Sequence, residues 1–181
     1  MGALPSVAGS AGRTVTILTM PARKVEILRE TARTHRLTTM IETGLWNGRG
    51  SGMALRDDGT IATYYALDIQ PDNCALGKRE CPAATIVCGD SRWTLPTVLS
   101  QLAGPALIWL DAHWLEPTEG FTTCPLLWEL ACIPNHHTVL IDDIRLMGWP
   151  GYPTLTELHK FAARWNVQVF EDIMRLTPPS P

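Results

Sequence analysis

Three aspartates in this chain follow apolar runs and could together bind a metal ion. Asp111 ends one run, and Asp142 and Asp143 end the next. If the two runs are neighbouring strands of a parallel sheet, the three carboxylates meet at one edge of it. Like charges at such short range resist ionisation unless a cation lies between them, and oxygen ligands suit Mg²⁺ or another hard divalent ion. The alternative is that Asp142 and Asp143 cap the following segment or pair with Arg145.

A histidine lies close to the first of these acids and could move a proton. His113 follows Asp111 in the segment Trp-Leu-Asp-Ala-His. An ordinary imidazole pKa of about 6.5 suits a general base at neutral pH. The same side chain could instead be a metal ligand, contact a ligand, or brace its loop. We therefore predict Asp111 and His113 as the catalytic residues.

Acids end five apolar runs in all, and their spacing predicts the fold. Glu42, Asp68 and Asp90 close three earlier runs, and roughly 20 to 30 residues separate successive acids. That spacing fits a strand, a crossover helix and two short loops, so the chain is expected to consist of repeated βα units. Parallel strands point their carboxyl ends at the same edge, so the five acids would face one cleft. The predicted strands are 38–41, 64–67, 85–89, 106–110 and 138–141.

Helical patterns fill the segments between these runs. The predicted helices are about 22–37, 53–56, 70–81, 93–102, 124–132 and 154–165. Two further short strands are expected at 167–170 and 173–176. The sequence therefore predicts an α/β fold: a doubly wound, Rossmann-like, mostly parallel sheet of about six to seven strands with helices on both faces.

Length and composition limit the organisation of the chain. A chain of 181 residues can bury one α/β core without disulfides or a structural metal. A Gly-, Ala- and Ser-rich start and a Pro-rich end flank this core. We expect a flexible lead over 1–12, a single domain over 13–176 and a flexible tail over 177–181.

Charge and cysteine content exclude several classes of partner and compartment. The net charge is −3 with scattered basic residues, which is unlike a nucleic-acid-binding protein. The apolar stretches are too short for a membrane span, and the start does not read as a secretory signal. The five cysteines lack the close Cys-x-x-Cys pairs of zinc sites and are expected to be free thiols. We therefore predict a cytoplasmic protein with no nucleic-acid and no membrane partner.

A glycine-rich segment follows the first predicted strand. It runs from Glu42 to Gly52 as Glu-Thr-Gly-Leu-Trp-Asn-Gly-Arg-Gly-Ser-Gly and opens a helix, the context expected of a nucleotide-binding turn. Gly44 and Gly48 are too far apart for the dinucleotide pattern Gly-x-Gly-x-x-Gly. A dinucleotide is therefore not favoured, and a glycine-rich turn without a ligand is the remaining alternative. Trp46 in this turn could stack on a ligand.

The order of these motifs over about residues 38–176 resembles the class I methyltransferases, which use S-adenosylmethionine. The resemblance rests on the Glu-Thr-Gly-x-x-x-Gly turn, the acid ending the second strand, the segment Cys-Gly-Asp-Ser from Cys88, and the two later aspartate runs. In that family the turn lies against the methionine part of the cofactor, the second-strand acid holds the ribose, and the third-strand aspartate lies by the adenine. The family turn is more often Gly-x-Gly-x-Gly. The cofactor contacts that the resemblance implies for this chain are Glu42, Gly44, Gly48, Asp68, Asp90 and Ser91. We add Trp46 to the predicted contacts, because it falls in a loop at the ligand edge, where its ring could stack on the adenine or on the acceptor.

The later aspartates resemble a narrower group, the metal-dependent O-methyltransferases of the macrocin type. There, one aspartate after the fourth strand and a pair after the fifth bind Mg²⁺, which holds two substrate hydroxyl oxygens and lowers the pKa of one. The resemblance implies Asp111, Asp142 and Asp143 as metal ligands and O-methylation of a small hydroxyl-bearing substrate. The chain also resembles bacterial proteins that share the Trp-Leu-Asp-x-His run, the helix 125–130 and Ile-Asp-Asp-x-Arg. That likeness supports the fold more than the chemistry.

Two other functions fit parts of the sequence. The Asp-Ala-His segment resembles that of arginase-like metal-dependent hydrolases, although this chain is shorter and lacks their Asp-x-Asp cluster. A non-catalytic cofactor-binding subunit is the other alternative, because the short chain leaves an open cleft or a site that a partner completes. That partner could be a second copy in a homo-oligomer.

Overall fold

A single seven-stranded sheet forms the centre of the protein. The computed structural model describes residues 22–46, 50–113 and 124–179. The strand order is β3-β2-β1-β4-β5-β7-β6, and neighbouring strands are parallel except that β7 is antiparallel to both β5 and β6. The strands are β1 (Thr39–Thr43), β2 (Thr63–Asp68), β3 (Thr85–Cys88), β4 (Leu107–Leu110), β5 (Thr138–Ile141), β6 (Asn166–Phe170) and β7 (Ile173–Thr177). The predicted α/β, mostly parallel sheet is confirmed.

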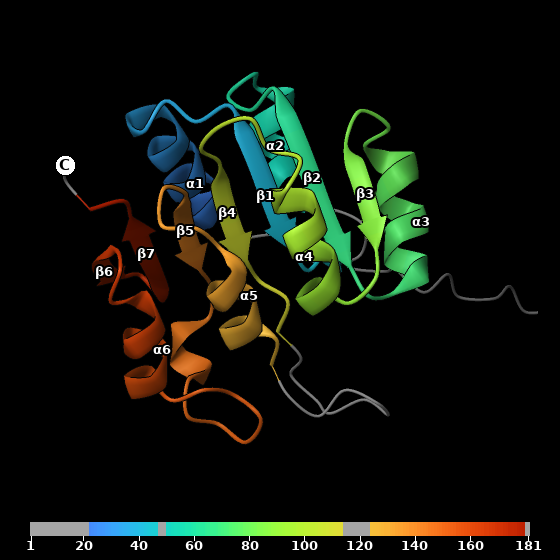
Figure 1. Ribbon diagram of the computed structural model, residues 1–181. Helices are drawn as coiled ribbons and strands as arrows, with labels where there is room; N and C mark the ends of the chain where they lie inside the picture. Colours follow the sequence, from blue (N-terminus) through green and yellow to red (C-terminus); the bar gives the residue numbers. More distant parts are fainter. Residues whose placement is uncertain (1–21, 47–49, 114–123, 180–181) are drawn as a thin grey trace, which may run out of the picture.

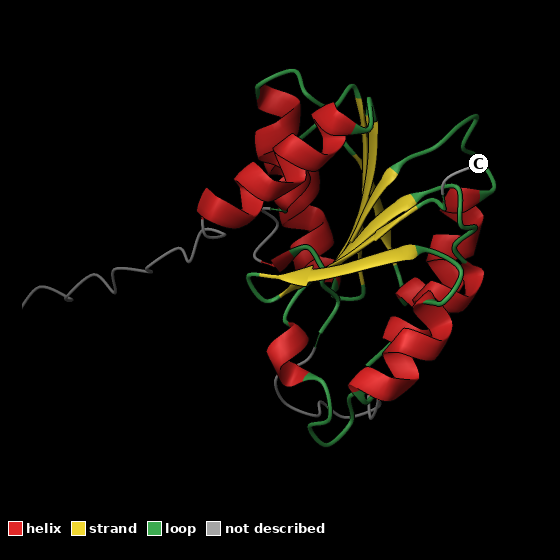
Figure 2. Ribbon diagram, turned by 90° about the vertical axis from the view of Figure 1, so that its left-hand side faces the viewer, coloured by secondary structure: helices red, strands yellow, loops and turns green. Residues whose placement is uncertain are grey.

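Helices cover both faces of this sheet, as predicted (Figures 1 and 2). One face packs against α1, α2 and α3, and the other against α4, α5 and α6. The helices are α1 (Ala22–Thr34), α2 (Ser51–Asp57), α3 (Pro71–Glu80), α4 (Ser91–Leu99), α5 (Leu126–Cys132) and α6 (Leu155–Ala162), with a 3-10 turn η2 (Ile144–Leu146). The arrowheads of β1 to β5 all point the same way, so their carboxyl ends share one edge (Figure 1).

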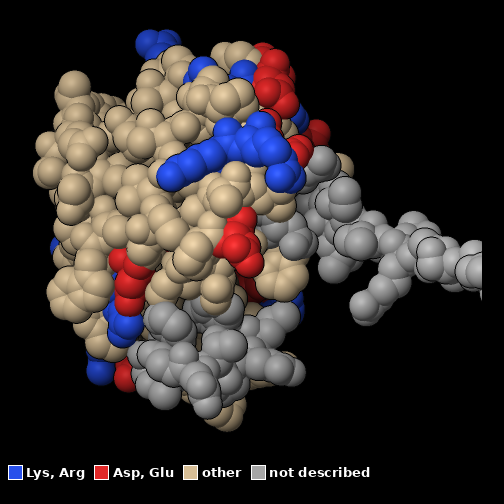
Figure 3. All heavy atoms as spheres, turned by 90° about the vertical axis from the view of Figure 1, so that its right-hand side faces the viewer, with Lys and Arg blue, Asp and Glu red and all other residues tan. Residues whose placement is uncertain are grey.

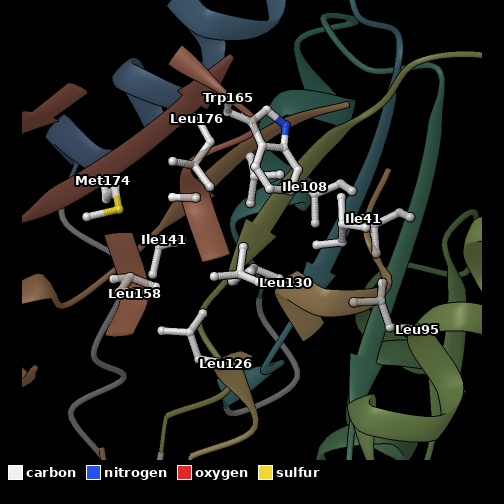
Figure 4. Packing of buried hydrophobic residues seen from close by; sticks show 14 of the residues in the cluster. Ile41, Leu95, Ile108, Leu126, Leu130, Ile141, Leu158, Trp165, Met174 and Leu176 are labelled. Carbon is white, nitrogen blue, oxygen red and sulfur yellow. The ribbon is translucent and has the colours of Figure 1, made fainter. Parts of the chain in front are cut away.

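Alternation along the strands explains why two layers of helices are needed. Successive strand residues point to opposite faces, and every residue of β4 and β5 is buried. On one face Ile41, Ile108 and Ile141 pack with Leu130 of α5 and Leu158 of α6 (Figure 4). A second cluster fills the opposite face under α1, α2 and α3. The two cores hold the strand ends, and hence the acids that follow them, in fixed positions.

Capping explains where two helices begin. Helix α4 starts at Ser91, earlier than predicted, because the carboxylate of Asp90 accepts a hydrogen bond from the amide of Arg92. Helix α6 starts where predicted, because Thr154 and Glu157 form a reciprocal capping box. Several helices, including α1 and α6, end earlier than the periodicity suggested. Asp90 is therefore already engaged in the structure of its own turn.

Some predictions fall outside the described residues. These are the lead over 1–12, the start of the predicted domain up to residue 21, Gly48, and residues 180–181 of the predicted tail. Thr177 belongs to β7, so the prediction that it is part of a flexible tail is wrong for this residue. No helix within the described ranges has the length and apolar character needed to cross a membrane. On the side of the molecule that carries α3 and β3, basic side chains form one band across the middle of the view, and acidic side chains lie next to its end and at separate places around it (Figure 3).

Candidate cofactor and metal site

The first turn after β1 joins two parts of the sheet edge. The amide of Gly44 donates to the carbonyl of Leu67 at 2.8 Å, at the end of the neighbouring strand β2. Gly44 has a φ of +87°, and a Cβ added there would lie 2.5 Å from the carbonyl oxygen of Asp111. A side chain at this position would therefore strain the backbone and collide with the end of β4. The turn depends on glycine here.

Glu42 supports this turn from below. It is 1% exposed, and its two carboxyl oxygens accept four hydrogen bonds. Oε1 accepts from the amide and the hydroxyl of Ser51 at 2.8 and 2.9 Å, and Oε2 from the amide of Gly52 at 3.0 Å and the hydroxyl of Tyr64 at 2.5 Å. Burial raises the pKa of Glu42, and these hydrogen bonds partly oppose the rise. The carboxyl group thus anchors the start of α2 under the predicted cofactor position.

Asp68 ties the first turn to the end of β2. Its Oδ2 accepts from the amide of Leu45 at 2.7 Å and from Nδ2 of Asn73 at 3.2 Å, and its Oδ1 accepts from the amide of Gln70 at 2.7 Å. A carboxylate offers about four acceptor positions. Asp68 thus keeps capacity for one ligand hydroxyl, and the Asn73 contact is the longest of the three.

The residues after β3 have partners of their own. Asp90 forms a salt bridge with Arg92 at 2.6 Å. Burial would raise the pKa of Asp90, but the hydrogen bonds that it accepts from Arg92 outweigh burial and lower that pKa. Ser91 is buried beside Asp90. Trp46, the remaining predicted cofactor contact among the described residues, has 64% of its surface exposed, so its indole is accessible near the first turn. Asp90 is therefore ionised and held in place by Arg92.

The three later aspartates come together at the sheet edge as predicted. One ligand oxygen from each of Asp111, Asp142 and Asp143 lies within 4.8 Å of the others. Burial and then the charges of Asp142, Glu42 and Asp143 raise the pKa of Asp111 well above its ordinary value. Burial also raises the pKa of Asp142. Such a cluster carries excess negative charge that a cation would offset.

A lysine that the sequence analysis missed already contacts two of these acids. Nζ of Lys24, from the first turn of α1, lies 2.5 Å from Oδ1 of Asp142 and 3.2 Å from Oδ1 of Asp143. Arg145 also pairs with Asp143 at 2.8 Å, as the alternative prediction for that acid had it. Burial would raise the pKa of Asp143, but the charges of Lys24 and Arg145 outweigh it and lower that pKa. The cluster is thus partly neutralised by the protein itself.

His113 contacts protein groups through both ring nitrogens. Nε2 lies 3.2 Å from the carbonyl oxygen of Asp142, and Nδ1 lies 3.5 Å from Sγ of Cys124. A carbonyl can only accept, so Nε2 carries the proton and Nδ1 accepts from the thiol. Burial lowers the pKa of His113 to about 4, which makes it neutral at pH 7 and a weak base. This geometry favours a role in positioning Asp142.

A buried glutamate near the site also escaped the sequence analysis. Glu129 of α5 is fully buried, and neither carboxyl oxygen has a hydrogen-bond partner among the described residues. Burial raises its pKa to about 7, and the neighbouring hydroxyls of Ser91 and Thr43 oppose this only in part. The sequence signal was weak, because a glutamate on a predicted helix is normally exposed.

We expect Glu129 to make the protein less stable as the pH rises. Because its pKa in the folded state lies above the ordinary value, its stabilising effect is complete below pH 4.5 and disappears as the pH rises through about 7. Between pH 5 and 8 this group should lower the free energy of unfolding by about 2 to 3 kcal/mol. In urea denaturation, the free energy of unfolding of Glu129→Gln should fall by about 2 to 3 kcal/mol less than that of the wild type between pH 5 and 8. Glu30→Gln, on the exposed side of α1, should retain the full loss; an equal loss in both variants would contradict this assignment.

Comparisons with known proteins identify the fold. No protein-family model matches the sequence, and no curated protein matches it. Among solved structures, a methyltransferase from Podospora anserina with bound S-adenosylhomocysteine (SAH) is similar with a TM-score of 0.63 and 18% identity, over 90% of this chain and 80% of that one. An O-methyltransferase from Bacillus cereus in complex with SAH has a TM-score of 0.61 and 13% identity, over 88% and 82%. The O-methyltransferase TomG from Streptomyces achromogenes in complex with S-adenosylmethionine has a TM-score of 0.56 and 13% identity, over 91% and 83%. The chain thus has the Rossmann-like fold of these enzymes.

Proposed function

We propose that this protein is an S-adenosylmethionine-dependent methyltransferase that methylates a hydroxyl oxygen of a small molecule. One observation carries the proposal: the glycine turn after β1 contacts both Asp68, the proposed cofactor-binding acid, and Asp111 of the aspartate cluster. The amide of Leu45 binds Asp68, and Gly44 of the same turn lies against the backbone of Asp111. A cofactor held at Asp68 would thus lie beside an acceptor held at Asp111, and methyl transfer needs little more than that alignment and removal of a proton.

The cofactor would occupy the edge from β1 to β3. Gly44 allows close approach of the turn, Asp68 would accept a ribose hydroxyl at its remaining acceptor position, and Asp90 with Ser91 would lie by the adenine. Gly48, outside the described residues, and the accessible indole of Trp46 are further proposed contacts. The bound SAH or S-adenosylmethionine in the three similar structures supports this ligand.

A divalent cation such as Mg²⁺ would bind between Asp111, Asp142 and Asp143. The donor set fits, because three carboxylates of this spacing supply the hard oxygen ligands that the ion prefers. When bound, the ion would lower the pKa of the acceptor hydroxyl. Asp111 would contact the ion and the acceptor, while His113 would hold the backbone of Asp142. Because both nitrogens of His113 are already engaged, the Asp-Ala-His segment is poorly suited to the two-ligand metal site of the hydrolase alternative.

Calorimetry with SAH tests the proposal directly. SAH should bind the purified protein, and Mg²⁺ or Mn²⁺ should bind separately at the acids. A folded sample that binds Mn²⁺ but no SAH would contradict the methyltransferase assignment and favour the hydrolase. A sample that binds SAH but no divalent ion would restrict the proposal to a metal-independent enzyme. Sedimentation in the same buffer would report whether a homo-oligomer forms. The proposal includes a cytoplasmic location and neither nucleic-acid nor membrane partners.

A further inference from the structure

Lys24 occupies the position at which a cation would contact Asp142. Its Nζ lies 2.5 Å from Oδ1 and 2.6 Å from Oδ2 of that residue, so one ammonium faces both carboxyl oxygens. The same nitrogen lies 3.2 Å from Asp143. The side chains of Lys24 and Asp142 are 18% and 3% exposed, so solvent screens this pair weakly. We infer that Lys24 is a built-in competitor of the divalent cation at this cluster, an inference that rests on the metal site of the proposed function.

Ammonium and divalent ion cannot share Asp142 in this arrangement. Mg²⁺ binds carboxylate oxygens at about 2.1 Å. An ion at that distance from either Asp142 oxygen would place two positive charges within a few ångströms of each other, in a site with little water to screen them. Binding of the ion therefore requires that Lys24 leave Asp142.

A divalent ion would contact one more carboxylate of the cluster than Lys24 does, namely that of Asp111. Lys24 reaches only Asp142 and Asp143, and no hydrogen bond or ion pair reaches the Asp111 side chain from other described residues. An ion between the three acids would contact Asp111 as well. Lys24 thus stabilises the ion-free protein, and the divalent cation gains the third carboxylate in exchange.

The position of Lys24 on its helix allows this exchange. It lies in the first turn of α1, and its side chain is already 18% exposed. The long side chain can therefore turn towards solvent without unfolding the helix. The adjacent Arg23 instead pairs with Glu26 and Glu171 on the surface, away from the cluster. Binding of the ion should therefore release the Lys24 side chain and leave Arg23 in place.

Mn²⁺ affinity of two neighbouring variants tests the competition. Lys24→Met should bind Mn²⁺ at least about ten-fold more tightly than the wild type, because the acids no longer need to release an ammonium. Arg23→Met removes a charge from the same turn and should bind as the wild type does. Lys24→Arg keeps the charge and should remain weak. Equal or weaker Mn²⁺ binding by Lys24→Met would overturn the inference.

Lysine labelling gives a second test, which uses only the wild-type protein and so does not depend on whether a variant folds. Acetylation of Lys24, followed by mass spectrometry, should become several-fold faster when Mn²⁺ is added. Lys78 and Lys160 are exposed and should react equally fast with and without the ion. An unchanged rate at Lys24 in the presence of bound Mn²⁺ would overturn the inference. Calorimetry with SAH on the same sample separates the two claims, because loss of cofactor binding would refute the methyltransferase while leaving the Mn²⁺ result readable.

Discussion

Replacement of Asp68 with alanine should abolish tight binding of SAH to an otherwise folded protein. The carboxylate would lose its proposed hydrogen bond to the ribose, and it would also release the amides of Leu45 and Gln70, which it holds at 2.7 Å. Hydrogen bonds to charged groups contribute about 1.5 to 3 kcal/mol each. Loss of the ribose contact together with disorder in the first turn should weaken SAH binding at least about 100-fold, as measured by calorimetry.

Asp72 provides the matched control for this result. It is an exposed aspartate at the start of α3, close in sequence to Asp68, and no hydrogen bond among the described residues joins it to the glycine turn after β1. Asp72→Ala should bind SAH as tightly as the wild type does. If Asp68→Ala also binds SAH normally while retaining a cooperative thermal transition, the ribose does not lie at Asp68 and the proposed cofactor position is wrong.

The parallel part of the fold was predictable because each strand carries its own evidence. Apolar runs such as 106–110 and 138–141 are buried on both faces, and their closing acids fall at one edge. The antiparallel placement of β7 was not predictable. It depends on a tight turn at Glu171 and Asp172, which adopt φ values of 47° and 67°. Turns of this kind usually carry Asn-Gly or Asp-Gly, so this pair of acidic residues gave no sign of one.

Partners close in sequence were easier to predict than partners brought together by the fold. The capping box of Thr154 and Glu157 follows from residues that are neighbours along one helix. The ion pair of Lys24 with Asp142 joins residues 118 positions apart, and no periodicity marks one lysine on an amphipathic helix as different from others. Sequence reasoning could therefore place the acids but not the cation that neutralises them.

Replacement of Glu42 with alanine should cost more stability than other single substitutions near the site. The change removes the carboxyl oxygens that accept four hydrogen bonds, from two backbone amides of α2 and from the hydroxyls of Ser51 and Tyr64. Each unsatisfied buried group costs about 1 to 3 kcal/mol, although hydroxyls can turn towards other acceptors. We expect the free energy of unfolding to fall by about 4 kcal/mol in urea denaturation.

Two further variants separate the hydrogen bonds of Glu42 from its charge. Glu42→Gln removes the charge that burial disfavours, yet its amide nitrogen must face a backbone donor whichever way it turns, because Oε1 accepts from the amide of Ser51 and Oε2 from that of Gly52. It should therefore remain clearly less stable than the wild type. Tyr64→Phe removes only one donor and should cost about 1 kcal/mol. A glutamine variant as stable as the wild type would contradict this assignment. It would show that the size of the side chain at position 42, and not its two acceptor oxygens, supports the start of α2.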